Sequence, residues 1–125
     1  MTRRQSVQPD GVAVPKVPYS SVIVSGDLVF TAGQAPFNAE GTLVLDSFDD
    51  QVHQTMRNLG ACLQSAGCGF DDVLKVTAYL TDPSYFARYN EIYGQYFSQP
   101  YPARTTLVVG LLGFDIEIEA VARKL

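Results

Sequence analysis

The stretch that decides the fold is PARTTLVVGLLGFDIEIEAVA, which covers residues 102–122. At both of its ends, side chains alternate between two faces as they do in β-strands. Both ends also carry charge at positions where a small domain usually buries apolar side chains. The glycine-bounded connection between them is short, so we expect the two strands to lie close together. On that arrangement the guanidinium of Arg104 and the carboxylates of Glu117 and Glu119 converge on one cleft.

The composition favours one globular domain. The chain has 125 residues, 46% of them hydrophobic, which is enough for one core and too little for two domains. We therefore expect a single domain over residues 1–125, with a proline-rich extended arm over residues 1–18. The formal net charge of −4 argues against a nucleic-acid partner, because proteins that bind a phosphate backbone usually present a basic surface.

The cysteines and the histidine do not suggest a metal centre. Cys62 and Cys68 lack the spacing of a zinc-binding pair, and His53 is the only histidine, so we expect no metal. Unpaired thiols are typical of a reducing compartment, and no apolar run like that of a signal peptide follows the N-terminus. No apolar run reaches the roughly 18 residues of a transmembrane helix. We expect a cytoplasmic protein with no membrane partner.

The predicted elements are a hairpin, a weak strand, a helix, a strand, a second helix and two strands. Hydrophobic periodicity and turn residues place them at 21–31, 42–45, 48–66, 73–80, 84–97, 102–109 and 114–122. This order predicts an α+β domain, with two helices packed on one face of a mixed sheet. We expect Val76, Ala78, Ile118 and Ala120 on the opposite face, where a partner subunit would cover them.

Several single residues allow two interpretations. Lys75 either pairs with a glutamate across the sheet or extends to solvent. Gly33 is either an ordinary turn glycine or a point where the backbone approaches a ligand, since it has no Cβ. His53 lies on a helix whose apolar stripe has an ordinary core explanation, so no chemistry is assigned to it. Arg104 and Glu117 could hold a carboxylate and activate water, or could form a structural salt bridge, and spacing does not decide between these.

Several short motifs together resemble the RidA/YjgF family of imine deaminases. They are Pro18-Tyr19-Ser20, Thr31-Ala32-Gly33-Gln34-Ala35-Pro36, Asn90-Glu91-Ile92-Tyr93, Pro102-Ala103-Arg104 and Glu117-Ile118-Glu119-Ala120. The resemblance implies a chorismate-mutase-like (ferredoxin-like) α+β protomer. It further implies a homotrimer with active sites between subunits, no cofactor, and hydrolysis of small 2-imino or enamine acids to 2-oxo acids and ammonia.

The same resemblance implies roles for individual residues. Arg104 would hold the substrate carboxylate, Glu117 would orient and activate water, and Glu119 would be a second, structural acid. Further cleft residues implied in this way are Tyr19, Gly33, Asn90, Tyr93 and Thr106.

The sequence also departs from the family pattern. Ala32 stands where the family often has serine, Ser21 where glutamine is common, Val17 where glycine is usual, and Thr106 where many members have cysteine. These departures leave the substrate open. Two other functions also stay open, a non-catalytic trimer that binds small carboxylates and a ribonuclease or translation inhibitor.

Overall fold

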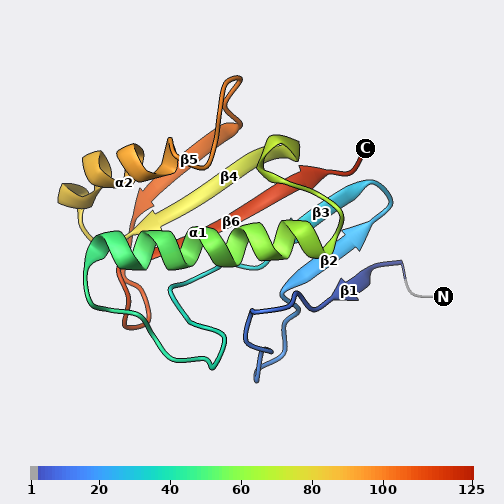
Figure 1. The fold of residues 1–125 in the computed structure, drawn as a ribbon, viewed down its shortest axis with the longest axis horizontal. Helices are drawn as coiled ribbons and strands as arrows, with labels where there is room; N and C mark the ends of the chain where they lie inside the picture. The colour runs from blue at the N-terminus through green and yellow to red at the C-terminus, as the bar shows by residue number, and fades with distance from the viewer. Residues whose placement is uncertain (1–2) are drawn as a thin grey trace.

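In residues 3–125, which the computed structural model describes, six strands form one mixed sheet and two helices cover one of its faces (Figure 1). The elements are β1 (Gln5–Val7), β2 (Val22–Ser25), β3 (Leu28–Thr31), α1 (Phe48–Ser65), η1 (Phe70–Asp72), β4 (Val73–Leu80), η2 (Pro83–Tyr85), α2 (Phe86–Tyr93), β5 (Ala103–Val108) and β6 (Ile116–Arg123). This arrangement confirms the predicted α+β class with two helices on one sheet face. None of the helices in this part of the chain is long and apolar enough to span a membrane.

Helix α1 is the long element that covers the sheet, and its limits follow from local chemistry (Figure 1). The Ser47 hydroxyl accepts a hydrogen bond from the Asp50 amide at 3.0 Å and so caps the first turn. Gly67 ends the helix with φ +79°, a conformation that glycine adopts without steric cost. One side of α1 is fully buried against the sheet and includes Val52, Met56, Leu59 and Leu63.

The strand order is β1-β2-β3-β6-β4-β5, which places β4 between the two charged strands. Strand β4 runs parallel to β5 and antiparallel to β6, and Val76 is opposite both Arg104 and Ala120. The expectation that the charged strands lie side by side is therefore wrong. The short connection between them crosses the end of β4, and the crossover through α2 makes β4 and β5 neighbours.

The predicted assignment of the sheet faces is also wrong. Val76, Ala78, Ile118 and Ala120 are buried in the core that the helices cover. Paired residues in a sheet share a face, so the opposite, uncovered face carries the residues that alternate with these four. We call this surface the open face, and it includes Ile23, Phe30, Lys75, Thr77, Tyr79, Thr105, Leu107, Glu117, Glu119 and Val121.

Lys75 pairs with neither glutamate of the open face. Its ammonium donates a 2.7 Å hydrogen bond to the hydroxyl of Thr105 on the adjacent strand. Glu119 instead accepts a 2.8 Å hydrogen bond from the Tyr79 hydroxyl. The interpretation of Lys75 as a cross-sheet partner of Glu117 or Glu119 is thus wrong.

Three predicted elements differ from the structure. Residues 42–45 form no strand, because only one isolated bridge, between Phe37 and Leu43, gives them a partner. The second helix is shorter than 84–97, since the chain opens with η2, continues as α2 and then turns as far as Phe97. Within the expected arm, β1 pairs with β2 and becomes an edge strand of the sheet; residues 1–2 of the arm lie outside the described residues.

Candidate functional site

Arg104 lies in an aromatic setting between β5 and α2. Its register places it on the helix-covered side of the sheet, but β5 is the edge strand, so its side chain lies next to α2. The guanidinium carbon is 4.7 Å from the ring centre of Tyr93, 5.2 Å from that of Tyr89 and 5.8 Å from that of Phe86. These distances are within the range of cation–π attraction. The three rings therefore hold the cation in place.

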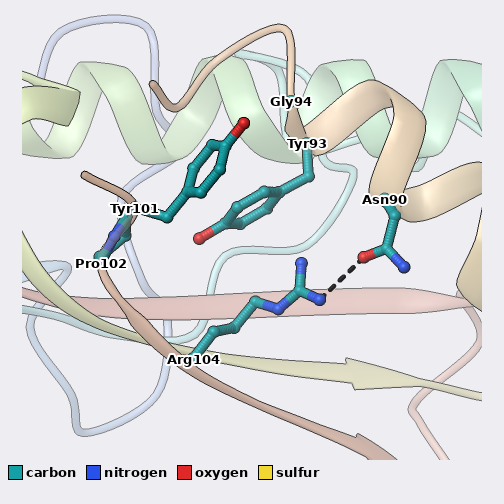
Figure 2. A pocket seen from close by; sticks show the side chains of 6 residues that line it. All are labelled: Asn90, Tyr93, Gly94, Tyr101, Pro102 and Arg104. Carbon is teal, nitrogen blue, oxygen red and sulfur yellow. Dashed lines mark hydrogen bonds between the residues drawn. The ribbon is translucent and has the colours of Figure 1, made fainter. Parts of the chain in front are cut away.

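Asn90 is the polar partner of this arginine. One terminal nitrogen of Arg104 donates a 2.8 Å hydrogen bond to Asn90 Oδ1, which orients the guanidinium plane (Figure 2). Among residues 3–125 no carboxylate forms an ion pair with Arg104. A partly buried cation without a counter-ion is a suitable site for an anionic ligand, and a guanidinium suits a planar carboxylate.

A cavity of about 420 Å³ opens beside the guanidinium (Figure 2). Its lining residues are Asn90, Tyr93, Gly94, Tyr101, Pro102 and Arg104. In Figure 2 the ring of Tyr93 lies next to the guanidinium of Arg104, and the ring of Tyr101 lies on the other side of the Tyr93 ring. The cavity therefore has one cationic wall and several apolar ones.

Three buried hydroxyls of α2 and β5 have no hydrogen-bond partner within the described residues. They belong to Tyr89, Tyr93 and Thr106. Burial raises the pKa of Tyr93 to about 12, although the nearby charge of Arg104 acts in the opposite direction. The phenol thus keeps its proton at neutral pH, so it can donate a hydrogen bond but cannot serve as a base.

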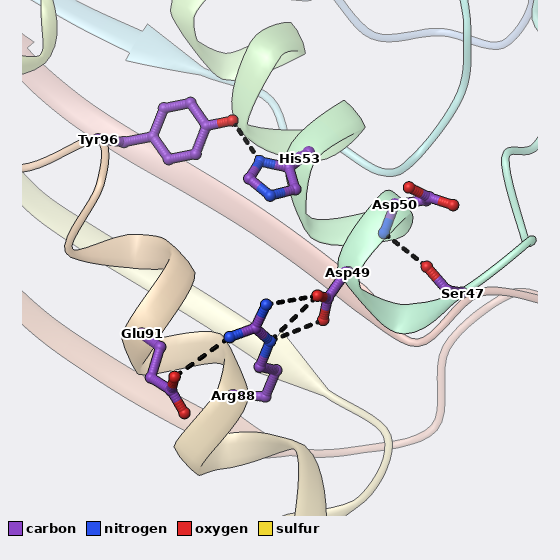
Figure 3. A network of polar contacts seen from close by, with 7 residues as sticks. All are labelled: Ser47, Asp49, Asp50, His53, Arg88, Glu91 and Tyr96. Atoms are coloured by element: carbon purple, nitrogen blue, oxygen red, sulfur yellow. Dashed lines mark hydrogen bonds and ion pairs between the residues drawn. The ribbon is translucent and has the colours of Figure 1, made fainter.

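A polar network fixes α2, which supplies Asn90 and Tyr93 to the cavity wall, against α1 (Figure 3). Arg88 of α2 donates to both carboxylate oxygens of Asp49 in α1 and also pairs with Glu91 at 3.1 Å. The hydrogen bond from Arg88 lowers the pKa of Asp49. Farther along, the imidazole Nδ1 of His53 lies 2.7 Å from the hydroxyl of Tyr96. These contacts set the position of α2 relative to the sheet.

Glu117 forms a second cluster with Gly33. The backbone amides of Gln34 and Ile118 each donate to the other residue's carbonyl, at 2.7 and 2.9 Å, which holds the segment after β3 against β6. A Cβ on Gly33 would stand 2.7 Å from the carboxyl carbon of Glu117, far inside van der Waals contact. The carboxyl group of Glu117 therefore packs against the backbone at Gly33, in the space that a side chain there would occupy.

The environment of Glu117 makes it easier to protonate. Desolvation by burial raises the pKa of Glu117, and the negative charge of Glu119 raises it further. Glu119 itself is fixed by Tyr79, and this hydrogen bond is the main reason that the pKa of Tyr79 is raised. A raised pKa makes the carboxylate of Glu117 a stronger base than an ordinary glutamate, which suits a group that accepts and returns a proton.

The structure therefore divides the predicted site residues into two groups. Arg104, Asn90 and Tyr93 meet at the cavity, and Thr106 follows on the same face of β5. Glu117 and Gly33 meet at β6, whose glutamates point from the open face. The prediction that arginine and glutamates converge on one cleft within a single chain is wrong.

Tyr19 stands apart from both groups. It lies in the loop before β2 and is 55% exposed. Sequence reasoning assigned no site role to Phe86, Tyr89 or Tyr101. The spacing of Phe86, Tyr89 and Tyr93 at i, i+3 and i+7 could have identified one helix side that faces the arginine.

The fold and these two clusters define a small α+β protein with a candidate anion-binding pocket at the edge of its sheet. A family model described as Endoribonuclease L-PSP matches residues 11–124. The chain belongs to this family, the RidA/YjgF family, as its motifs indicated.

Individual relatives agree with this membership. A RutC family protein of Pyrococcus horikoshii is 43% identical over 88% of this chain and 90% of its own length. The human protein named 2-iminobutanoate/2-iminopropanoate deaminase is 39% identical over 84% of this chain and 79% of its own. The crystal structure of E. coli TdcF with bound serine has a TM-score of 0.89 and 30% identity, and the match covers 97% of this chain and 99% of that one. The family thus includes proteins named as imine deaminases.

Proposed function

We propose that this protein is a hydrolytic deaminase that converts small 2-imino or enamine acids to 2-oxo acids and ammonia. The observation that carries this proposal is the guanidinium of Arg104, which lies against a cavity with no carboxylate of residues 3–125 paired to it. A cation placed in this way can bind the carboxylate of an imino acid through two parallel hydrogen bonds. The name of the human relative and the serine bound to the E. coli neighbour support the same substrate chemistry.

We propose that the active site is completed between copies of this chain in a homotrimer. Arg104 and Glu117 point from opposite faces of one sheet, so one protomer cannot present both to a single small substrate. The open face offers apolar side chains, including Phe30, which is 41% exposed. A second copy that covers this face would bury those side chains and would bring Glu117 of one protomer toward Arg104 of another.

The proposed chemistry assigns a separate task to each half of the site. Arg104 fixes the carboxylate, which presents the adjacent imine carbon. Glu117 accepts a proton from water as the water oxygen bonds to that carbon, and it returns the proton to the nitrogen. The hydroxyl of the resulting aminoalcohol then passes its proton through Glu117 to the nitrogen, the carbon–nitrogen bond breaks, and ammonia leaves as the carbonyl forms. An enamine must first become an imine by taking up a proton at carbon and losing one from nitrogen.

The test is release of ammonia from a 2-imino acid generated in the assay, with 2-iminobutanoate as the first substrate. We expect formation of 2-oxobutanoate to be faster than in buffer alone, and we expect the Arg104→Lys protein to lose most of this acceleration. Carboxylate binding without acceleration would favour a non-catalytic binding protein instead. A parallel incubation with RNA addresses the ribonuclease alternative, which the net charge of −4 argues against.

A further inference from the structure

The cavity beside Arg104 is larger and more aromatic than a four-carbon acid needs. At about 420 Å³ it falls within the roughly 300–1,000 Å³ of pockets that enclose drug-sized ligands. Tyr93, Tyr101 and Pro102 supply its apolar walls. Tyr101 is 56% exposed, so much of its ring is free to contact a bound molecule. A ligand anchored at the arginine would thus extend along the ring of Tyr101.

The charges of the lining side chains also limit which ligands fit the cavity. Of the residues that line it, Arg104 alone carries a formal charge, and Asn90 is the one side-chain amide. The amide oxygen of Asn90 already accepts from Arg104. A second carboxylate on the ligand would therefore find no second cation among the lining residues of the protomer that supplies Arg104, and burying an unpaired carboxylate is costly.

We infer that this cavity receives the side chain of the substrate, and that it favours monocarboxylic 2-imino acids with large apolar or aromatic side chains. Small imino acids leave the exposed ring of Tyr101 uncovered, and dicarboxylic ones place a charge against it. This inference rests on the proposed function, because it takes Arg104 as the carboxylate anchor. Tyr101 becomes a specificity-determining residue.

Binding of stable 2-oxo acids tests the inference without depending on turnover. Calorimetric titration would compare 2-oxobutanoate, phenylpyruvate and 2-oxoglutarate on the same protein. We expect phenylpyruvate to bind about tenfold more tightly than 2-oxobutanoate, in line with what a few apolar carbons contribute in a pocket, and 2-oxoglutarate to bind most weakly. Equal or reversed affinities of the first two acids overturn the inference but leave the proposed function standing. If none of the three acids binds, both fail.

Two variants of Tyr101 assign the effect to this cavity. Tyr101→Ala removes the exposed ring, and the ratio of phenylpyruvate affinity to 2-oxobutanoate affinity should fall about fivefold to tenfold. Tyr101→Phe keeps the ring and should keep that ratio near the wild-type value. An unchanged ratio in Tyr101→Ala would show that the side chain binds elsewhere and would overturn the inference. Because Tyr101 is exposed, we expect both variants to fold, so a change in the affinity ratio would reflect the lost ring contact.

Discussion

Arg104 and Glu117 project from opposite faces of the same sheet, and strand β4 lies between the strands that carry them. Val76 is the cross-strand neighbour of Arg104, whereas Tyr79 is that of Glu117. The separation rules out a direct salt bridge between the two residues within one chain. It also means that each residue can be changed without unpairing the other in the same protomer.

This separation predicts complementation between two inactive variants. In mixed trimers of Arg104→Lys and Glu117→Gln chains, some sites would combine the intact arginine of one chain with the intact glutamate of another. Every trimer that contains both variants should have one restored site of its three, whichever variant is present twice. The measurement is turnover of 2-iminobutanoate after the two variants are co-expressed and purified through different tags. Each variant prepared alone in the same way is the control, and a mixture no more active than these controls would refute a shared site.

Arg104→Lys should lower kcat/KM for 2-iminobutanoate about 10–100-fold, the range expected when a charged hydrogen bond is lost. Lysine keeps the charge but cannot make two parallel bonds to a carboxylate. The thermal midpoint should change little, because Arg104 has no acidic partner in residues 3–125 that would be left unpaired. Kinetics together with a melting curve give both quantities. Near wild-type kcat/KM in this variant would assign Arg104 a structural role.

Glu117→Gln should reduce turnover about 10²-fold while binding of 2-oxobutanoate survives, because glutamine keeps the volume but cannot take a proton. The raised pKa of Glu117 also fixes the sign of the stability effect. The folded protein binds this proton more tightly than the unfolded chain does. Stability contributed by Glu117 is thus present below the unfolded pKa of about 4.3 and is lost as pH rises through the folded pKa.

The glutamine variant should therefore have a thermal midpoint at pH 7 equal to or above that of the wild type. Glu91→Gln makes the same chemical change in an exposed side chain bonded to Arg88 and serves as the matched control. A clearly lower midpoint in Glu117→Gln, with turnover per folded protein intact, would identify a structural acid rather than a base.

Gly33→Ala should abolish the proposed deaminase activity by displacing Glu117. The new methyl group would occupy the space of the glutamate carboxyl, and the flexible side chain would move rather than the backbone. A displacement of about 1 Å in a catalytic group can cost about 10²-fold in rate. Gly33 does not have positive φ, so alanine is conformationally allowed and the protein should still fold. Gly69→Ala, where a methyl group meets no neighbour within 4 Å, is the control, and equal rates in both variants would contradict this role.

Phe30→Glu should break the proposed trimer. Phe30 lies opposite Val121 on the open face, and a carboxylate there would have to be buried between subunits. Sedimentation should give about three times the 13.7 kDa chain mass for the wild type and a smaller species for the variant. Phe30→Leu keeps the surface apolar and should behave like the wild type. A wild-type protein that sediments as a monomer would remove the basis of the shared site.

Elements defined by local chemistry were predictable from the sequence. The prediction of the hairpin was correct because Gly26 supplies the positive φ that its turn needs. The prediction of α1 was correct because Ser47 caps its first turn and Gly67 ends it. The family motifs named Asn90 and Tyr93 as cleft residues. Both line the cavity, because positions three residues apart lie on the same side of α2. Whether they bind substrate stays a prediction.

Long-range pairing was not predictable in the same way. Period-2 alternation showed that Arg104 and Thr106 share a face, but it could not show which face the helices cover. The short connection before Phe114 suggested adjacent strands, although β4 pairs with both β5 and β6 and separates them. The link between Gly33 and Glu117 depends on the bridge from Gln34 to Ile118, for which the sequence has no local signal.

The crossover from β4 through α2 to β5 has a consequence for how this protein could diversify. Every residue that lines the cavity belongs to α2, to β5 or to the segment between them, and Glu117 belongs to a different strand. Exchange of residues 83–104 for the same segment of a relative would replace the recognition surface in one step. Glu117, the proposed water-activating acid, and its contact with Gly33 would stay unaltered, so we expect such an exchange to change substrate choice separately from reactivity.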